Sequence, residues 1–282
     1  MSFWLRSSTL QVGGNIYSLD DFAFEFDVPF EDNEQLMTIK VTIYNLAEST
    51  RGSIRKNQPV IINAGYRGDI GVIFQGMVSN HLSKHKGTEW ITEITATEVM
   101  QEWMSAKVNK TYNAGIDAES IVKDQLNIFG VEVAKLELAQ NKVYPRGLVC
   151  DKPVRDLLRE IVTSDCKSIF MVRHGQVMIR DPATGTDLGV FLSPASGLLF
   201  DGKEDQDTTE IVAPQDTQKT QEQRASEGKY IKRRCLLNYR IAPGDIIGIR
   251  DGTQNGSFIV KKGAHKGSRK GDWITELEVV PA

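Results

Sequence analysis

The sequence predicts an α+β fold that is mainly β, with two similar antiparallel β-barrel domains in one chain and a small α/β domain between them. Three observations lead to this expectation: a repeated segment in the two halves, period-two alternation of apolar residues in the first third, and helix signals confined to the middle. The predicted domains are residues 1–105 for the first barrel, 106–185 for the α/β domain and 186–282 for the second barrel.

The repeat is centred on the tetrapeptide Trp-Ile-Thr-Glu, which occurs at residues 90–93 and again at residues 273–276. The surroundings correspond as well, because His85-Lys86-Gly87 precedes the first copy and His265-Lys266-Gly267 precedes the second. A duplicated β unit is evidence for a repeated structural unit rather than for a chemical activity. Trp90 and Trp273 are therefore interpreted as packing residues at one equivalent barrel position, rather than as a ligand-stacking pair.

Turn and alternation signals predict about five to seven antiparallel strands in the first unit. Gly13-Gly14-Asn15 is typical of a tight hairpin turn, and residues 37–43 alternate between apolar and polar side chains. Residues 60–66 and 72–78 are expected to be two further strands. A second polar turn is expected at residues 83–87, before the strand that contains Trp90.

The middle of the chain carries helix signals. Asp117 is placed to cap a helix that contains Ile121 and Leu126, and Gly130 is placed to end it. A second helix is expected after Asp151-Lys152-Pro153, because apolar residues recur there at helical spacing: Val154, Leu157, Leu158, Ile161 and Val162. A hairpin is expected to follow, with strands at 169–172 and 177–179 and its turn at His174-Gly175.

A polar stretch at residues 203–229 separates this domain from the second repeat copy. It has almost no large apolar side chains, so it cannot bury enough surface to offset its ordering entropy. We expect a long loop or an extended arm there. β character returns at residues 230–231 and 234–239.

Composition limits the class of protein. The chain has 282 residues, of which 40% are hydrophobic and 25% charged, as in globular proteins with room for two or three domains. The net charge of −3 provides no general attraction to nucleic acid or to an anionic membrane. No apolar run approaches the roughly 18 residues of a membrane span, and the start lacks a signal-peptide pattern, so we expect no membrane insertion.

No residue is predicted to be catalytic, to bind a cofactor or to bind a metal. Cys150, Cys166 and Cys235 lack the close spacing of zinc ligands and are expected to be buried reduced thiols. His81 and His85 lack the glutamate of a zincin helix, so they are expected to be surface or interface residues. His174 is assigned to a turn, and His265 to a polar loop without a ligand partner. Gly65, Gly68 and Gly71 match no phosphate-binding loop and are assigned to turns.

A basic cluster near the second repeat is the best sequence argument for nucleic-acid contact. Its members are Lys261, Lys262, Lys266, Arg269 and Lys270, with Lys229, Lys232, Arg233 and Arg234 nearby. Small β-barrels of the OB type bind single strands through such patches when stacking aromatic residues accompany them. Because no aromatic residue lies among these charges, we favour a solvated hairpin loop or a charged subunit contact.

Several segments resemble phage baseplate hub proteins. Residues 236–245 (Leu-Leu-Asn-Tyr-Arg-Ile-Ala-Pro-Gly-Asp), followed by 255–260, His265-Lys266-Gly267 and 273–276, are similar to the C-terminal part of these hubs. Residues 41–46 (Val-Thr-Ile-Tyr-Asn-Leu), 60–66 and Gly68-Asp69 look like their first barrel. The resemblance implies two tail-tube-like barrels per chain and a homotrimeric ring with six similar positions.

The function implied by this resemblance is mechanical and not enzymatic, without cofactors. Such a ring would join a sixfold tail tube to a threefold central spike and enclose a channel through which DNA passes without sequence-specific binding. The implied partners are the chain itself, the central spike protein, tail tube or distal tail proteins, and other baseplate proteins. The implied location is the virion tail baseplate, assembled in the bacterial host cytoplasm. Two alternatives are a single-stranded nucleic-acid-binding protein with paired OB-like barrels and a tail-associated cell-wall hydrolase.

Overall fold

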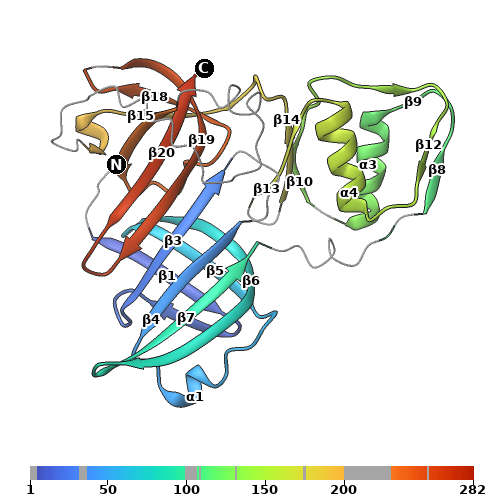
Figure 1. Ribbon diagram of the computed structural model, residues 1–282. Coiled ribbons are helices and arrows are strands. Elements are labelled where there is room, and N and C mark those ends of the chain that lie inside the picture. Colours follow the sequence, from blue (N-terminus) through green and yellow to red (C-terminus); the bar gives the residue numbers. More distant parts are fainter. Residues whose placement is uncertain are drawn as a thin grey trace, which may run out of the picture.

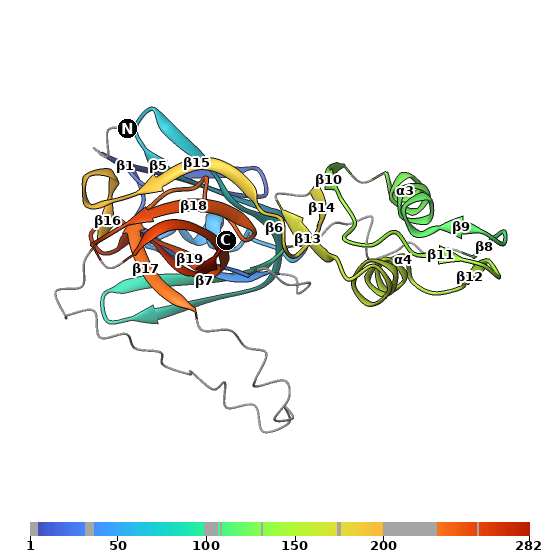
Figure 2. The ribbon, with the colours of Figure 1, turned by 90° about the horizontal axis from the view of Figure 1, so that it is seen from above.

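The computed structural model describes residues 5–31, 37–98, 107, 109–130, 132–173, 176–199, 230–252 and 254–282. The fold is α+β and mainly β, as the sequence predicts. A 13-stranded sheet forms the body of the molecule, and a small α/β module extends from one side of it in both views (Figure 1, Figure 2). The predicted arm at 203–229 lies outside the described residues.

The large sheet contains the strands before and after the module. Its members are β1 (Arg6–Val12), β2 (Asn15–Ser18), β3 (Phe24–Glu31), β4 (Thr38–Tyr44), β5 (Pro59–Tyr66), β6 (Asp69–Lys86), β7 (Glu89–Thr97), β15 (Thr186–Leu192), β16 (Leu198–Leu199), β17 (Ile231–Leu236), β18 (Asp245–Arg250), β19 (Asn255–Ser268) and β20 (Trp273–Pro281). Two short helical segments accompany them, α1 (Glu48–Arg51) and the 3-10 turn η2 (Pro194–Ser196). The strands of the two predicted units therefore belong to one hydrogen-bonded sheet, joined where β3 pairs with β19.

Period-two burial explains how this sheet encloses its cores. In β3, Phe24, Phe26, Val28 and Phe30 are buried, while the residues between them are exposed. The first three pack in a core with β1 and β4 to β7, whereas Phe30 packs in a second core with residues of β17 to β20. A single strand thus contributes to both cores, which ties the two units together.

Several local features differ from the sequence predictions. Gly65 and Gly71, which were assigned to turns, lie within β5 and β6, and only Gly68 lies in the turn between them. The predicted turn at 83–87 is wrong, because β6 continues to Lys86 and only Gly87-Thr88 forms the turn. Gly87 there has a φ of 64°, which glycine adopts at little cost. The large sheet is also not wholly antiparallel, because β15 pairs with β18 in parallel. Strand β3 was not predicted at all.

The α/β module has its own core. Its elements are β8 (Lys110–Tyr112), β9 (Ile116–Asp117), α3 (Ala118–Phe129), β10 (Val133–Leu136), β11 (Val143–Tyr144), β12 (Leu148–Cys150), α4 (Val154–Arg159), the π-helical segment η1 (Glu160–Asp165), β13 (Ile169–Arg173) and β14 (Gln176–Arg180). The predicted apolar positions from Val154 to Val162 are all buried, but the helix widens to π geometry after Arg159. The hairpin of β13 and β14 is present, and its turn at residues 174–175 lies outside the described residues.

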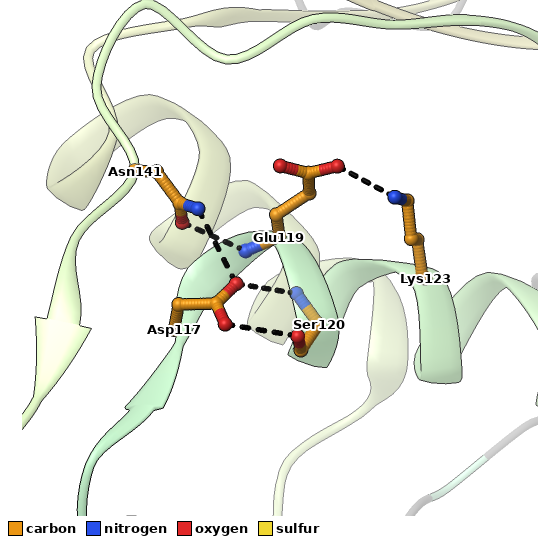
Figure 3. A network of polar contacts seen from close by, with 5 residues as sticks. All are labelled: Asp117, Glu119, Ser120, Lys123 and Asn141. Carbon is orange, nitrogen blue, oxygen red and sulfur yellow. Dashed lines mark hydrogen bonds and ion pairs between the residues drawn. The ribbon is translucent and has the colours of Figure 1, made fainter.

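Helix α3 begins and ends where its sequence predicts. The Asp117 carboxylate accepts hydrogen bonds from the Ser120 backbone N–H at 2.9 Å and from the Ser120 hydroxyl at 3.0 Å (Figure 3). Asn141 closes the network, since its amide donates to Asp117 and its carbonyl oxygen accepts from the Glu119 N–H. Gly130 ends the helix with a left-handed φ of 63°. The bond from the Ser120 backbone holds the pKa of Asp117 below its ordinary value.

We predict that Asp117→Ala destabilises the module, whereas Asp117→Ser, which retains an N-cap acceptor, has a smaller effect. Because the folded-state pKa of Asp117 is lowered, its contribution is present above the unfolded-state pKa and is lost as pH falls through the folded-state value. Amide hydrogen exchange of α3 at neutral and at acidic pH measures both effects. Equal protection of α3 in wild type and Asp117→Ala at neutral pH would contradict this prediction.

Candidate assembly surface

Four strands of each unit lie in the same order and correspond to one another. The order β4-β7-β6-β5 in the first unit matches β17-β20-β19-β18 in the second, and every neighbouring pair is antiparallel. The register matches too. Thr92 lies opposite Ile43 and Ser83, while Thr275 lies opposite Cys235 and His265. The repeated Trp-Ile-Thr-Glu segment is therefore a repeat of strand pairing. The predicted correspondence of the preceding His-Lys-Gly segments is wrong, because His85 lies opposite Trp90, whereas Gly267 lies opposite Trp273.

The threonine of each repeat copy points inward and makes one hydrogen bond across the hairpin. The Thr92 hydroxyl lies 3.1 Å from the Ser83 hydroxyl, and Thr275 Oγ1 lies 2.9 Å from His265 Nδ1. His265 is buried, with its ring centroid 4.8 Å from that of Phe30. The assignment of His265 to a polar loop is therefore wrong, because it lies inside β19 and packs in the sheet interior.

The glutamate of each copy points to the opposite face and binds lysine. Glu93 in β7 lies 2.7 Å from Lys84 of β6 and 3.5 Å from Lys40 of β4. In the second unit, Glu276 lies 2.7 Å from Lys266. The hydrogen bond that Lys84 donates lowers the pKa of Glu93, and the hydrogen bond that Lys266 donates to Glu276 raises the pKa of Lys266, so each pair favours its charged form.

A second glutamate of β20 repeats the three-strand arrangement of Glu93. Glu278 lies 3.2 Å from Lys262 of β19 and 3.8 Å from Lys232 of β17, the counterparts of β6 and β4. Two lysines of the predicted basic cluster, Lys262 and Lys266, and the nearby Lys232 are thus paired with carboxylates on a strand face rather than lying in a loop. Arg269 and Lys270 lie in the β19–β20 turn, where the Arg269 guanidinium donates to the Asp20 carbonyl at 3.0 Å.

The tryptophans of the two copies differ in their surroundings. Trp273 is 2% exposed, and its indole N–H donates to the Gly65 carbonyl of the first unit at 3.2 Å. Trp90 is 38% exposed, and the guanidinium carbon of Arg51 lies over its indole ring, 3.9 Å from the ring centroid. The prediction that the two tryptophans pack at equivalent positions is therefore wrong, because only Trp273 packs against another unit of the same chain.

The contact between the units is a continuation of the sheet. Residues Glu25–Glu31 of β3 pair with Lys262–Ser268 of β19, beside the part of β19 that pairs with β18. Two glycines of β19 make room for aromatic rings of β3. A Cβ at Gly267 would lie 2.2 Å from the Phe26 ring, and one at Gly263 would lie 2.7 Å from the Phe30 ring. The ladder thus depends on close approach at these two positions.

Polar contacts outside this ladder also join the two units. The Arg6 guanidinium donates to the Gly271 carbonyl at 2.7 Å. Asp69 accepts from both Arg240 terminal nitrogens at 3.0 and 2.6 Å, and from the Tyr239 hydroxyl at 2.9 Å. The hydrogen bonds from Arg240 hold the pKa of Asp69 below its ordinary value. A bidentate pair of this kind adds directional specificity to the contact.

The remaining predicted residues form no chemical site. His81 and His85 lie on the distal half of β6, while His174 and Lys229 lie outside the described residues. All three cysteines are buried and free. Among the residues that the structure describes, no group of histidine, cysteine or carboxylate side chains could hold a metal ion. In that same part of the chain, no helix has both the length and the apolar character for a membrane span.

Sequence reasoning missed the junction, although part of it carries a signal. Phe24, Phe26, Val28 and Phe30 alternate with polar or proline residues, which is the pattern of a half-buried strand. No pattern within one strand could indicate its pairing with β19, because that contact joins segments more than 200 residues apart. The pairing of Asp69 with Arg240 is equally non-local.

The two tryptophans provide a matched test of this geometry. We predict that Trp273→Ala lowers the free energy of unfolding by about 3–5 kcal/mol, because it leaves a cavity between the units. Trp90→Ala removes a half-exposed ring over arginine and should cost about 1 kcal/mol or less. Urea denaturation of both variants measures the difference, and equal destabilisation would contradict the assignment.

No protein-family model and no curated protein sequence matches the chain. Solved structures do match, at low sequence identity. The 43 kDa tail protein of prophage MuSo2 from Shewanella oneidensis is 11% identical, with a TM-score of 0.64 over 98% of each chain. A tail protein from Neisseria meningitidis MC58 is 10% identical, with a TM-score of 0.64 over 98% of this chain and 96% of that one.

A third match comes from a secretion apparatus. The E. coli c3393 protein, described as a component of the type VI secretion system with structural similarity to the T4 bacteriophage tail proteins gp27 and gp5, is 10% identical. It aligns with a TM-score of 0.59 over 97% of this chain and 76% of its own. The chain thus has the fold of phage tail proteins and of a related type VI secretion component.

Proposed function

We propose that the chain is a structural hub subunit of a phage or phage-derived tail baseplate. Three copies form a ring that joins a sixfold tail tube to a threefold central spike. The partners are two further copies of the chain, the spike, the tube or distal tail proteins, and other baseplate proteins. The site of action is the tail baseplate of the virion, and the role is mechanical rather than enzymatic.

The observation that carries this proposal is the repeated order of four strands within one continuous sheet. Each unit acts as one tube-like barrel, so three chains provide six similar positions without a hexamer. The likeness of nearly the whole chain to two tail proteins supports the same reading.

The charged face of the sheet suits a channel for DNA. On this face, Glu93 and Glu278 each lie between lysines of the two flanking strands, and Glu276 binds Lys266. Lysines that are already paired with carboxylates neutralise few phosphates, so few counterions are released from the DNA and a duplex gains little by binding them. We assign this face to the lumen, where DNA passes without being held.

The same pairing favours the hub over a single-strand-binding protein. Of the nine basic residues that suggested nucleic-acid contact, Lys232, Arg233, Lys262 and Lys266 have carboxylate partners. The third sequence alternative, a tail-associated cell-wall hydrolase, gains no catalytic constellation from the described residues. We therefore retain the hub alone.

Self-association tests the proposal most simply. The protein should have a mass of three times 31.5 kDa in solution, or should reach it on binding a cognate spike. Mass photometry over a range of concentrations, with and without spike, makes this measurement. A monomer under both conditions would count decisively against the hub.

DNA binding tests the assignment of the lumen face. We predict negligible binding of single- or double-stranded DNA by wild type at low salt, measured by fluorescence anisotropy. Replacing the acids of this face, as in Glu93→Gln with Glu276→Gln and Glu278→Gln, should produce binding that weakens as salt rises, because it leaves the lysines unpaired. Strong, salt-dependent binding by wild type would instead support the nucleic-acid-binding alternative.

A further inference from the structure

One arginine is fully buried where the α/β module meets the second unit. Arg180, the last residue of β14, is 0% exposed and pairs with Ile169 of β13. Its neighbour Ile179 packs in the core of the module. Because successive side chains of a strand point to opposite faces, Arg180 points away from that core. A fully buried guanidinium is costly unless its surroundings hold it through hydrogen bonds.

The guanidinium holds the connection that leads from the module to the second unit. Arg180 Nη1 donates to the Thr184 carbonyl at 2.6 Å and to the Asp181 carbonyl at 3.0 Å. The Thr184 N–H donates in turn to the Asp181 carbonyl at 3.1 Å, so residues 181–184 form a closed turn. A guanidinium suits this position, since its N–H donors form a rigid fork.

The guanidinium also lies against a glycine of the second unit. Gly244 directly precedes β18, and a Cβ at this position would lie 2.5 Å from Arg180 Nε. A second close approach lies along the connection, where a Cβ at Gly185 would lie 2.3 Å from Ile246 Cγ1. The Thr186 N–H then donates to the Gly244 carbonyl at 3.1 Å. The two glycines thus let the connection and the arginine lie directly on the second unit.

Gly244 belongs to a segment that both units hold in place. Residues 237–244 connect β17 to β18. Leu237 is buried in the core of the first unit, and Ile241 is buried in the core of the second. The Tyr239 hydroxyl donates to Asp69 of the first unit at 2.9 Å. The segment therefore offers the guanidinium a fixed seat.

We propose that Arg180 is a pin that locks the α/β module onto this seat at Gly244, so that the module and the large sheet move as one body. Residues 181–185 would otherwise be a short hinge, because a few loop residues can absorb a large change in φ and ψ. Arg180 is thus a positioning residue. In a protein with a mechanical role, the pin passes a force on the module to the sheet. The inference concerns a single chain and goes beyond the proposed ring.

Substitutions on both sides of the junction test the pin. Arg180→Met removes the donors and the charge, and Gly244→Ala places a methyl group in the seat without changing the module. Spin labels at Val149→Cys of the module and Ser257→Cys of the second unit, both exposed, report the distance between the two parts. The native cysteines are buried and should not be labelled.

Pulsed electron paramagnetic resonance measures the distribution of this distance. The labelled chain is diluted into unlabelled chain, so that only distances within one chain are measured. The doubly labelled protein should give one narrow distribution without further substitution, and a distribution at least twofold wider with Arg180→Met or Gly244→Ala.

Each variant has a matched control. Arg146→Met changes an exposed arginine of the module. Gly252→Ala changes a second glycine of the second unit with a left-handed φ, 95° against 81° at Gly244, but a Cβ at Gly252 meets open space. Both substitutions introduce the same residue as their partner variant without touching the pin. Both should therefore leave the distribution narrow.

Amide hydrogen exchange distinguishes a loosened module from an unfolded one. The amides of Thr184 and Thr186 should exchange at least tenfold faster in Arg180→Met and Gly244→Ala, while α3 keeps its protection. Narrow distributions in both variants, or loss of α3 protection in both, would overturn the inference. A wide distribution without either substitution would overturn it as well.

The outcome is independent of the test of the proposed function. A trimer whose module is loosely held would contradict the pin and leave the hub intact. A monomer with a narrow distribution that both variants widen would support the pin and count against the hub.

Discussion

The pairing of β3 with β19 is the constraint on which the rest of the large sheet depends. It places seven residues of β3 opposite seven of β19 and joins two four-strand groups into one surface. Because Phe26 packs in the first core and Phe30 in the second, a slip of one residue would turn both rings to the wrong face. Gly263 and Gly267 fix the register further, since only a residue without a Cβ fits beneath those rings.

The repeat distinguishes the contacts that stabilise each unit from the contact that one unit makes with another. Threonine and glutamate have the same roles in both copies: the threonine bonds into the core across the hairpin, and the glutamate binds lysine on the opposite face of the sheet. The tryptophan has a different role in each copy, because Trp273 donates a hydrogen bond to Gly65 of the other unit while Trp90 remains half exposed. A duplicated unit whose first copy leaves this tryptophan half exposed is suited to a ring in which the missing neighbour is another chain.

Local sequence patterns correctly predicted the features that depend only on residues close together in the chain. Asp117 and Gly130 mark the ends of α3 because capping involves only neighbouring backbone groups, and residues 37–43 alternate because one face of β4 is buried. The β3–β19 ladder, the parallel pairing of β15 and β18, and the contact of Asp69 with Arg240 could not be predicted, since each joins distant segments. The exposure of Trp90 could not be predicted either, because the sequence of its strand matches that of the strand with Trp273.

Electron cryomicroscopy of the assembled protein tests the central claim most directly. We expect a threefold ring with six similar β units around a channel. The Glu93 and Glu276 faces should line that channel. A twofold dimer, an open filament, or a ring whose subunits meet through the α/β module would contradict the hub as we describe it.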